Sequence, residues 1–415
     1  MIAKINNWFY QFLRRSQKYT DTDNVYLVKG NIWLTFGHLV SMLASFLLAM
    51  AFGNLLDPAV YGNYKYLLSL FGILEVTSLI GLNSAVEQAV ARDLEGSFTT
   101  AFKTKLKWAS FGSLAAIGAA VYYWVSGNEA FSVPLLISAV FLPLMNASRI
   151  YIYFLNGRKL FDTQTKYGIV TQVVFFAALL ATLLLTKNLF WLVAVYLATH
   201  TVLNYSFYLI TKLRFKPNKE EDPQTTNYGK HVSLMGVISQ VATYLDKILL
   251  FSFIGPAPLA VYSFATIFPE NIEIVLGNIN KLALPKLAPK SREEIRQSIM
   301  KKTWKLLFLT MAIMVLYIVT APYFFKILFP QYLASIPYSQ AYALSFIAVP
   351  ASFLATAFSA KMMKKELYLI KIANFINIVL MAVLIPFYGI WGAVIALIGA
   401  QIFKFGLVLF LFRKF

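Results

Sequence analysis

Long apolar runs recur along the whole chain and constrain its fold more than any other feature. A helix that crosses a bilayer needs about 20 mostly apolar residues, because its backbone groups must be satisfied within the helix. Twelve runs of this kind are present, at residues 31–56, 64–91, 106–127, 131–155, 168–186, 189–211, 232–254, 259–285, 303–328, 333–360, 367–386 and 390–412. We therefore predict an all-α polytopic membrane protein with about twelve transmembrane helices.

The composition agrees with a membrane protein and excludes several other classes. Of the 415 residues, 59% are hydrophobic and 13% are charged, whereas soluble globular chains average about 25% charged residues. Cysteine is absent, which excludes a disulfide framework, a thiolate metal site and a cysteine nucleophile. The formal net charge is +19, but the basic residues form short clusters between apolar runs instead of one basic domain. We therefore expect no nucleic-acid partner.

Basic residues are concentrated in every second loop between the predicted helices. Lys103, Lys105 and Lys107 form one such cluster, and others follow the runs 189–211 and 259–285. Because positive charge collects on the cytoplasmic side of a membrane, we predict that these loops and both termini are cytoplasmic. Apolar and basic residues in the leader, residues 1–30, are spaced as in a helix that lies on the membrane surface.

The chain contains an internal repeat. The segment "DPAVYGNY" at 57–64 matches "GPAPLAVY" at 255–262, and the same spacing pairs Glu75 with Glu273. Each half holds six predicted helices and starts on the cytoplasmic side, so we predict two lobes of six helices related by pseudo-twofold symmetry. The expected boundaries are an N-lobe at 31–211, a polar cytoplasmic linker at 212–231 and a C-lobe at 232–415.

The predicted helix 232–254 carries a stripe of polar residues that includes Gln240, Thr243, Asp246 and Lys247. Lipid does not solvate such a stripe, so it faces either neighbouring helices or a water-filled cavity. The repeat places Leu48 and Ala49 where the second half has Asp246 and Lys247, so the shared scaffold does not require these two charges. Lys247 is therefore a candidate contact for an anionic substrate, and Asp246, Gln240 and Thr243 are candidates for cavity lining or ion coupling. A structural ion pair with another helix is the alternative for each of the two charges.

Other charged residues also lie within the predicted spans. Arg149, Lys404 and Lys281 are candidate contacts for an anionic substrate, although a long basic side chain can also extend to the headgroup region. The carboxylates that could take up a proton or a sodium ion, or pair with these cations, are Glu75, Glu273 and Glu270. His38 lies on a polar stripe of the run 31–56 and is the histidine expected to face a cavity. The three histidines show no metal-ligand spacing.

Three segments resemble the polysaccharide flippases, which are Wzx-like translocases of O-antigen and exopolysaccharide units. They are "GPAPLAVYSFA" after the run 232–254, "NIVLMAVLIPFYGIWGAVIA" at 377–396 and "LLDPAVYGNYKYLLSLFGILEVTSLIGLNSAVEQAVAR" at 55–92. These flippases belong to the multidrug/oligosaccharidyl-lipid/polysaccharide exporter (MOP) superfamily, which also contains the MATE transporters. In the second segment, Gly389 and Gly392 would allow a tight turn and close helix packing.

The resemblance implies a V-shaped two-lobe transporter with basic residues in its cavity. It would flip undecaprenyl-pyrophosphate-linked oligosaccharides from the cytoplasmic to the periplasmic (outer) leaflet of a bacterial cytoplasmic membrane by alternating access. The implied partners are the lipid-linked oligosaccharide and membrane lipids, with polysaccharide polymerase and chain-length machinery as possible further partners. We expect no cofactor, and H⁺ or Na⁺ is the candidate coupling ion.

Two other functions are alternatives to the flippase. A MATE-like multidrug or cation antiporter would use acidic residues such as Glu75, Glu273 and Asp246, but Arg149 and Lys247 argue against a cationic substrate. A membrane polysaccharide polymerase or ligase needs a large periplasmic loop, and the longest candidate here is only about 329–337. Since no nucleophile–base pair stands out either, we predict a transporter and not an enzyme.

Overall fold

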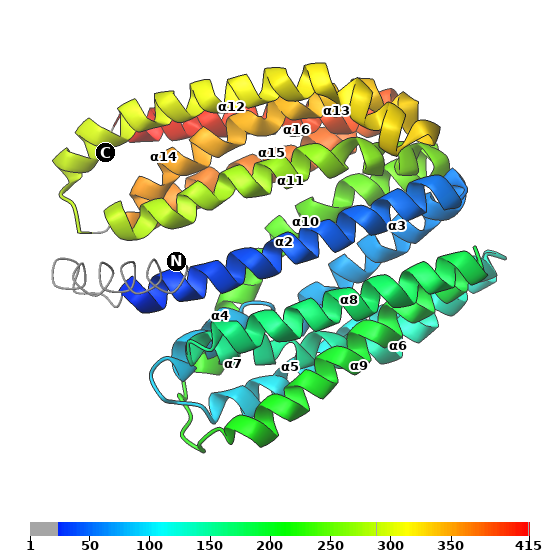
Figure 1. The fold of residues 1–415 in the computed structure, drawn as a ribbon, viewed down its shortest axis with the longest axis horizontal. Helices are drawn as coiled ribbons and strands as arrows, with labels where there is room; N and C mark the ends of the chain where they lie inside the picture. Colours follow the sequence, from blue (N-terminus) through cyan, green and yellow to red (C-terminus); the bar gives the residue numbers. More distant parts are fainter. Residues whose placement is uncertain (1–23, 288, 414) are drawn as a thin grey trace, which may run out of the picture. The chain divides into compact units, whose positions relative to one another are not determined.

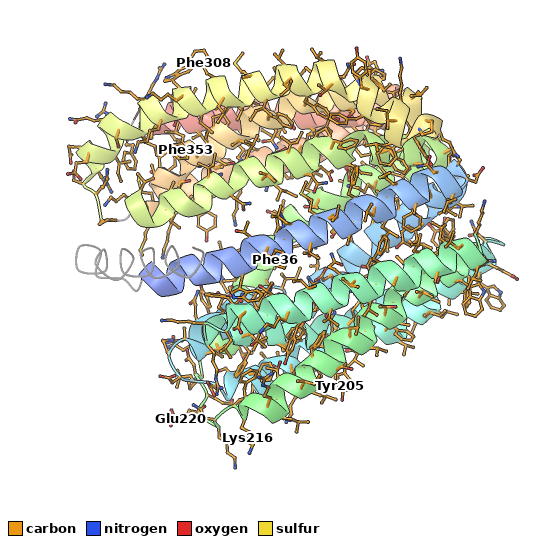
Figure 2. The ribbon with its side chains drawn as sticks, in the orientation of Figure 1. Phe36, Tyr205, Lys216, Glu220, Phe308 and Phe353 are labelled. Atoms are coloured by element: carbon orange, nitrogen blue, oxygen red, sulfur yellow. The ribbon has the colours of Figure 1, made fainter. Side chains whose placement is uncertain are left out.

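The computed structural model describes residues 24–287, 289–413 and 415, and this part of the chain is helical without strands. Eleven helices are long and apolar enough to cross a membrane, or twelve if one bent pair counts as a single span. Large apolar side chains such as Phe36 and Phe308 are exposed on the helices (Figure 2), as expected where lipid is the solvent. The prediction of an all-α membrane protein with about twelve spans is confirmed. The leader's surface helix lies largely outside the described residues.

Contacts divide the chain into two units. The first contains the described residues up to Ala49, Leu74–Thr186 and Phe190–Met235, and the second contains Met50–Ile73, Lys187–Leu189 and Gly236–Phe415. Two of the divisions fall well inside continuous helices, away from their ends: α2 (Asn24–Leu55) and α10 (Thr225–Ile254). These units are not the predicted six-helix lobes, so the lobe boundaries at 31–211 and 232–415 and their pseudo-twofold symmetry stay predictions.

The first unit is built mainly from α5 (Ser97–Val125), α6 (Glu129–Ser148), α7 (Ile150–Gly157), α8 (Phe161–Leu185) and α9 (Leu189–Phe215). Helix α5 packs along α6 (Figure 1). The ring of Phe98 contacts the rings of Phe154 and Tyr208, at centroid distances of 4.7 and 5.1 Å. Helices from three parts of the sequence therefore share one aromatic core.

The second predicted span is broken. Helix α3 (Pro58–Leu74) continues as the 3₁₀ helix η1 (Glu75–Ser78), and α4 (Leu82–Val90) follows after a bend of 52°. Leu79 has a φ of 54°, and a Cβ on Gly81 would lie 2.4 Å from the backbone nitrogen of Ser233. An apolar run as long as 64–91 exceeds the length that a straight span needs and can tilt or kink, and the bend is such a kink. By contrast, α11 (Pro256–Leu287) is one continuous helix although it contains Pro269.

The second unit also contains α12 (Arg292–Leu328), η2 (Pro330–Ser335), α13 (Ile336–Tyr342), η3 (Ala343–Ile347), α14 (Ala348–Ala360), α15 (Lys364–Tyr388) and α16 (Ile390–Phe412). Helix α14 packs against α11, α12 and α16 (Figure 1). Gly389, with a φ of 53°, joins α15 to α16, and a Cβ on Gly392 would lie 2.3 Å from the carbonyl oxygen of Leu384. The predicted tight turn and close packing are confirmed.

The two repeated segments meet inside this unit. Pro58 and Pro256 are the first residues of α3 and α11, where the missing N–H of proline costs nothing. A Cβ on Gly62 would lie 1.9 Å from the carbonyl oxygen of Pro256. Only a glycine allows the backbones to approach this closely, so the shared sequence element serves packing.

The linker is anchored to the first unit by polar contacts. Only 216–224 is non-helical, because α9 ends at Phe215 and α10 begins at Thr225. The buried carboxylate of Glu95 accepts hydrogen bonds from Nε and Nη2 of Arg158 and from the backbone N–H of Asn218 at 3.0 Å. The N–H of Gly96 donates to the carbonyl of Glu220 at 2.8 Å. Figure 2 shows the side chains of Lys216 and Glu220 on the outer side of the linker.

Glu95→Gln should release the linker. Burial opposes ionisation of Glu95, but the bonds from Arg158 and Asn218 outweigh it and hold the pKa of this carboxylate below its usual value. A lowered pKa stabilises the folded state above the unfolded pKa of about 4.3, and that stabilisation is lost as pH falls through the folded pKa. Hydrogen exchange at Gly96 and Asn218, corrected for intrinsic rates, should accelerate about tenfold at neutral pH in Glu95→Gln. In the parent, exchange at these two amides should accelerate only at acidic pH, where Glu95 is protonated.

The matched control is Glu220→Gln, since this exposed side chain lies in the same loop. It should leave the exchange of both amides unchanged. Equal protection of these amides in Glu95→Gln and in the parent would show that Glu95 does not hold the linker.

Candidate functional site

Arg149 lies at the junction of α6 and α7, on the wall of a cavity of about 410 Å³. Residues from α2, α6, α7, α8 and α9 line this cavity, and all belong to the first unit. Its volume is within the range of about 300–1,000 Å³ that small-molecule sites occupy. The lining residues are Ser41, Met145, Arg149, Tyr151, Ile152, Gly168, Thr171, Gln172, Tyr196, His200 and Asn204.

The guanidinium of Arg149 is only partly engaged by the protein. Its Nη1 lies 3.3 Å from Oε1 of Glu75, and the side chains of Arg149 and Glu75 are 45% and 24% exposed. A guanidinium has five N–H donors, so one long contact leaves most of them available to a ligand in the cavity. The structure thus brings together two of the predicted site residues, Arg149 and Glu75.

Aromatic and amide side chains surround Arg149. The imidazole of His200 contacts the rings of Phe175 and Tyr196, at centroid distances of 4.4 and 5.0 Å. Tyr196, His200 and Asn204 all line the cavity from α9. Hydropathy does not single out these three residues, although their spacing of four places them on one face of a helix and is a readable signal.

Lys105 is a further residue that the sequence analysis placed wrongly. It was assigned to a basic loop, but α5 begins at Ser97 and carries Lys105 into the first unit, where it is only 2% exposed. Its Nζ donates to Oδ1 of Asn83 at 2.7 Å. A helix continues past the apolar run that identifies it, which is why hydropathy alone put this lysine outside the helix.

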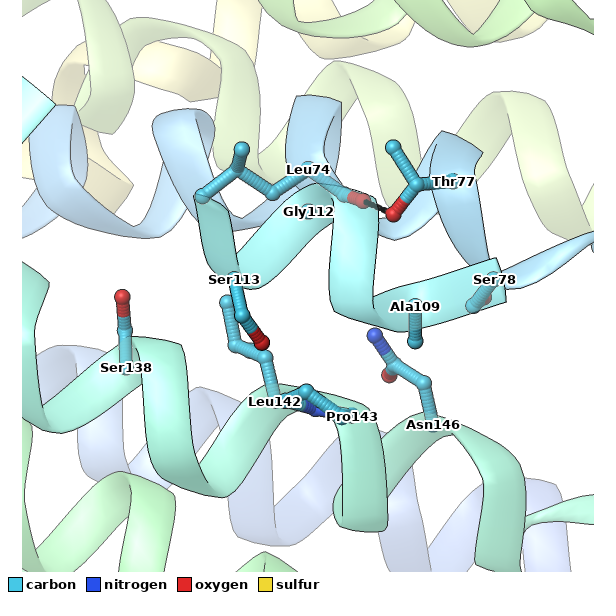
Figure 3. Close-up of a pocket in the computed structure, with 10 residues that line it drawn as sticks. All are labelled: Leu74, Thr77, Ser78, Ala109, Gly112, Ser113, Ser138, Leu142, Pro143 and Asn146. Carbon is cyan, nitrogen blue, oxygen red and sulfur yellow. Dashed lines mark hydrogen bonds between the residues drawn. The ribbon is translucent and has the colours of Figure 1, made fainter. Parts of the chain in front are cut away.

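A second, very small cavity lies between η1, α5 and α6 (Figure 3). Its volume of about 10 Å³ is about that of one water molecule. Thr77 Oγ1 donates to the carbonyl of Leu74 at 2.8 Å, and Ser113 Oγ donates to the carbonyl of Ala139 at 2.6 Å. The buried Oδ1 of Asn146 has no hydrogen-bond partner among the described residues. The small residues here pack η1 against α5.

Asp246 and Lys247 pair with each other in the second unit. The Nζ of Lys247 lies 3.3 Å from Oδ2 of Asp246, and the two side chains are 15% and 8% exposed. Oδ1 of Asp246 accepts from the backbone N–H of Lys247 at 2.7 Å, and Oδ2 accepts from the hydroxyl of Tyr262 at 2.8 Å. Lys65 and Glu270 are electrostatic neighbours of this pair. Among the described residues, the two charges therefore pair with each other within α10 and not with a charge on another helix, and the assignment of Asp246 and Lys247 to a cavity stays a prediction.

Glu273 and Lys404 form another charged group of the second unit. Ser345 Oγ donates to Glu273 Oε2 at 3.3 Å, and Lys404 Nζ donates to Ser352 Oγ at 3.1 Å. The charges of Glu273 and Lys404 interact, and Glu270 hydrogen bonds with Tyr342. The carboxylates proposed for coupling therefore have neighbours that can respond to a change in their charge.

The remaining predicted site residues are dispersed. Gln240 donates to the carbonyl of Gly72 at 3.3 Å, and Thr243 donates to the carbonyl of Ser239 at 2.9 Å. His38 is exposed on α2, and the side chain of Lys281 lies outside the described residues. Within the described part of the chain, no group of three histidines or carboxylates could hold a metal ion.

Comparisons with known proteins identify the family. The model of a family described as "Polysaccharide biosynthesis protein" matches residues 27–288, while no curated protein matches the chain. Among solved structures, lipid II flippase MurJ in an inward closed conformation is 14% identical, with a TM-score of 0.72 over 93% of this chain and 87% of that one. A MATE transporter in complex with MaD5 is 12% identical, with a TM-score of 0.64 over 93% and 96%.

A third structure is an inward-facing multidrug resistance MATE transporter of the MOP superfamily. It is 12% identical, with a TM-score of 0.60 over 93% of this chain and 98% of that one. These likenesses give the fold, and together with the family model they confirm the resemblance predicted from the sequence. This multi-pass membrane protein belongs to the polysaccharide biosynthesis protein family.

Proposed function

We propose that this protein flips undecaprenyl-pyrophosphate-linked oligosaccharides from the cytoplasmic to the periplasmic leaflet of the cytoplasmic membrane. The observation that carries the proposal is the partly engaged guanidinium of Arg149 in a cavity of about 410 Å³. Family membership and the fold of a lipid II flippase support it.

The chemistry of the cavity suits a sugar pyrophosphate. Such a headgroup cannot cross about 30 Å of hydrocarbon unaided. Arg149 would replace phosphate hydration with charge-assisted hydrogen bonds, for which a guanidinium is suited because it can bind two oxygens at once. Gln172, Asn204 and Tyr196 line the same cavity and would hydrogen bond or stack with the sugar next to the pyrophosphate. The lipid tail would stay in the bilayer.

The charged groups of the second unit are the proposed coupling elements. Glu273 and Glu270, with Asp246 as a third candidate, would take up H⁺ or Na⁺ and bias the protein between inward-open and outward-open states. Each of these carboxylates has a basic neighbour, Lys404 or Lys247. A change of charge on the carboxylate would therefore change the electrostatic force on the helix that carries the lysine. The alternating basic loops support a cytoplasmic location for both termini.

A second candidate function is export of organic cations, as the fold of the multidrug MATE transporters suggests. The acidic side chains of the second unit favour it. Their basic neighbours weaken it, because a carboxylate that is already compensated attracts a cation less strongly. In the first unit, Arg149 would repel a cation outright.

Reconstitution of the purified protein into liposomes tests the two functions side by side. The probe for flipping is a short polyprenyl-pyrophosphate oligosaccharide with a fluorophore on its sugar, and the fraction protected from a membrane-impermeant quencher measures transbilayer movement. We expect the protein to equilibrate this probe between leaflets, and not to move the same polyprenyl chain bearing a neutral sugar without phosphate. Ethidium should not accumulate in response to a proton or sodium gradient. Ethidium transport without lipid movement would reject the flippase and support the antiporter.

A further inference from the structure

The first unit buries a lysine that the proposed function does not use. Lys105 is 2% exposed, and the partner of its Nζ is the neutral amide oxygen of Asn83 at 2.7 Å. Within the described part of the chain, its ammonium has no carboxylate at ion-pair distance. A buried cation without a counter-ion is costly, so its presence needs a reason other than packing.

The break in the second span separates Glu75 from Asn83, the hydrogen-bond partner of Lys105. Glu75 begins η1 just before the break, and Asn83 follows the break in α4. On α5, residues 105, 109 and 112 share one face. Ala109 lines the small cavity beside Thr77 and Ser78 (Figure 3), and a Cβ on Gly112 would lie 2.4 Å from Oγ1 of Thr77. This face of α5 therefore packs on η1, which carries Glu75.

Lys105, Arg149 and Glu75 form a group of two cations and one carboxylate. The charge of Lys105 interacts with both other residues, while Glu75 contacts Arg149 through a single pair of atoms at 3.3 Å. A phosphate that binds Arg149 competes with Glu75 for the guanidinium and repels the carboxylate. Lys105 uses one of its three N–H donors on Asn83, so two remain for Glu75.

We propose that Lys105 is the alternative counter-ion of Glu75, which exchanges Arg149 for Lys105 when a phosphate of the substrate binds Arg149. The proposal rests on the function proposed above. In the empty cavity Glu75 holds Arg149, and Lys105 has only the amide oxygen of Asn83 as its partner. In the loaded cavity the phosphate holds Arg149 and Glu75 pairs with Lys105, so all the charges are compensated only in the loaded state. Lys105 is a positioning residue, because it acts on the substrate only through Glu75.

A double-mutant cycle tests this exchange. The probe is farnesyl pyrophosphate, with farnesol as the phosphate-free control, and its Kd is measured on the purified full chain in detergent. Lys105→Met should raise the Kd about tenfold, because Glu75 then has Arg149 as its only counter-ion. Glu75→Gln should lower the Kd, since it removes the competitor of the phosphate. In the Glu75→Gln background, Lys105→Met should have no further effect.

Lys107→Met is the matched control, because Lys107 is an exposed lysine two residues along the same helix. It should bind the probe like the parent. If Lys105→Met raises the Kd equally with and without the Glu75 carboxylate, or does not change it, the exchange is refuted. If Lys105→Met alone does not fold, the double variant with Glu75→Gln decides. A folded double variant with the Kd of Glu75→Gln supports the exchange. A double variant that still does not fold refutes it.

The parent and Arg149→Gln separate this inference from the proposed function. If the parent does not bind farnesyl pyrophosphate, or if Arg149→Gln binds it equally well, the phosphate site itself is wrong. If binding depends on Arg149 but not on the link between Lys105 and Glu75, only the exchange is wrong.

Discussion

Lys247→Ala should strongly destabilise the protein, and Asp246→Asn in the same chain should restore most of the lost stability. The single change leaves the carboxylate of Asp246, which is 8% exposed, without its cation. Breaking a buried pair in this way costs about 3–5 kcal/mol. In the double variant, the neutral asparagine side chain that replaces Asp246 can still accept the hydrogen bond that the hydroxyl of Tyr262 donates at 2.8 Å in the parent. The double variant therefore removes both charges and keeps an acceptor for the hydroxyl of Tyr262.

The measurement is the fraction of monodisperse protein that survives a heating series in detergent. Lys365→Ala is the control, because this lysine is exposed at the start of α15 and should behave like the parent. The sequence also allowed Lys247 to be a direct substrate contact. That alternative predicts the opposite result, with Lys247→Ala as stable as the parent but inactive in flipping.

Hydropathy and glycine positions predict much of the fold because they act locally. Each span is an apolar run long enough to cross the membrane. Gly389, with a φ of 53°, marks the turn between α15 and α16, as the segment around it suggested. For the break after Glu75, the only sequence signal is the length of the apolar run 64–91, since Leu79 in the left-handed region has no local signature.

Polar contacts between distant segments were not predictable in the same way. The linker 212–231 contains Pro217 and Pro223 and has the composition of a free connection, yet Glu95 fixes it through Asn218 and Arg158. These residues are far apart in sequence, and no periodicity relates them. Composition describes the solvation of a segment and not its partners.

Burial of charge was the signal for the charged residues predicted at the candidate site. Arg149 was found because its depth in a span is costly without a function. Lys105 was missed because its helix extends beyond the apolar run. Adjacent residues on a helix point about 100° apart, but the long side chain of Lys247 folds back to within 3.3 Å of the Asp246 carboxylate.

Arg149→Gln should reduce flipping about 10- to 100-fold. A hydrogen bond to a charged group contributes about 1.5–3 kcal/mol, and loss of the guanidinium removes this interaction from the step in which the pyrophosphate leaves water. Arg149→Lys should fall between the parent and Arg149→Gln, because lysine keeps the charge but cannot bind two oxygens in a fixed geometry. The loss should appear only for substrates with phosphate.

Phosphate binding by Arg149 is tested by the flipping rate of the fluorescent polyprenyl-pyrophosphate oligosaccharide in liposomes, compared between the parent, Arg149→Lys and Arg149→Gln. Arg296→Gln serves as the control, since Arg296 is exposed on α12, and equal thermal stability of all four proteins shows that the comparison concerns transport. We expect the flipping rate to fall in the order parent, Arg149→Lys, Arg149→Gln, with the rate of Arg296→Gln equal to that of the parent. Equal rates for the parent and a well-folded Arg149→Gln would contradict this expectation.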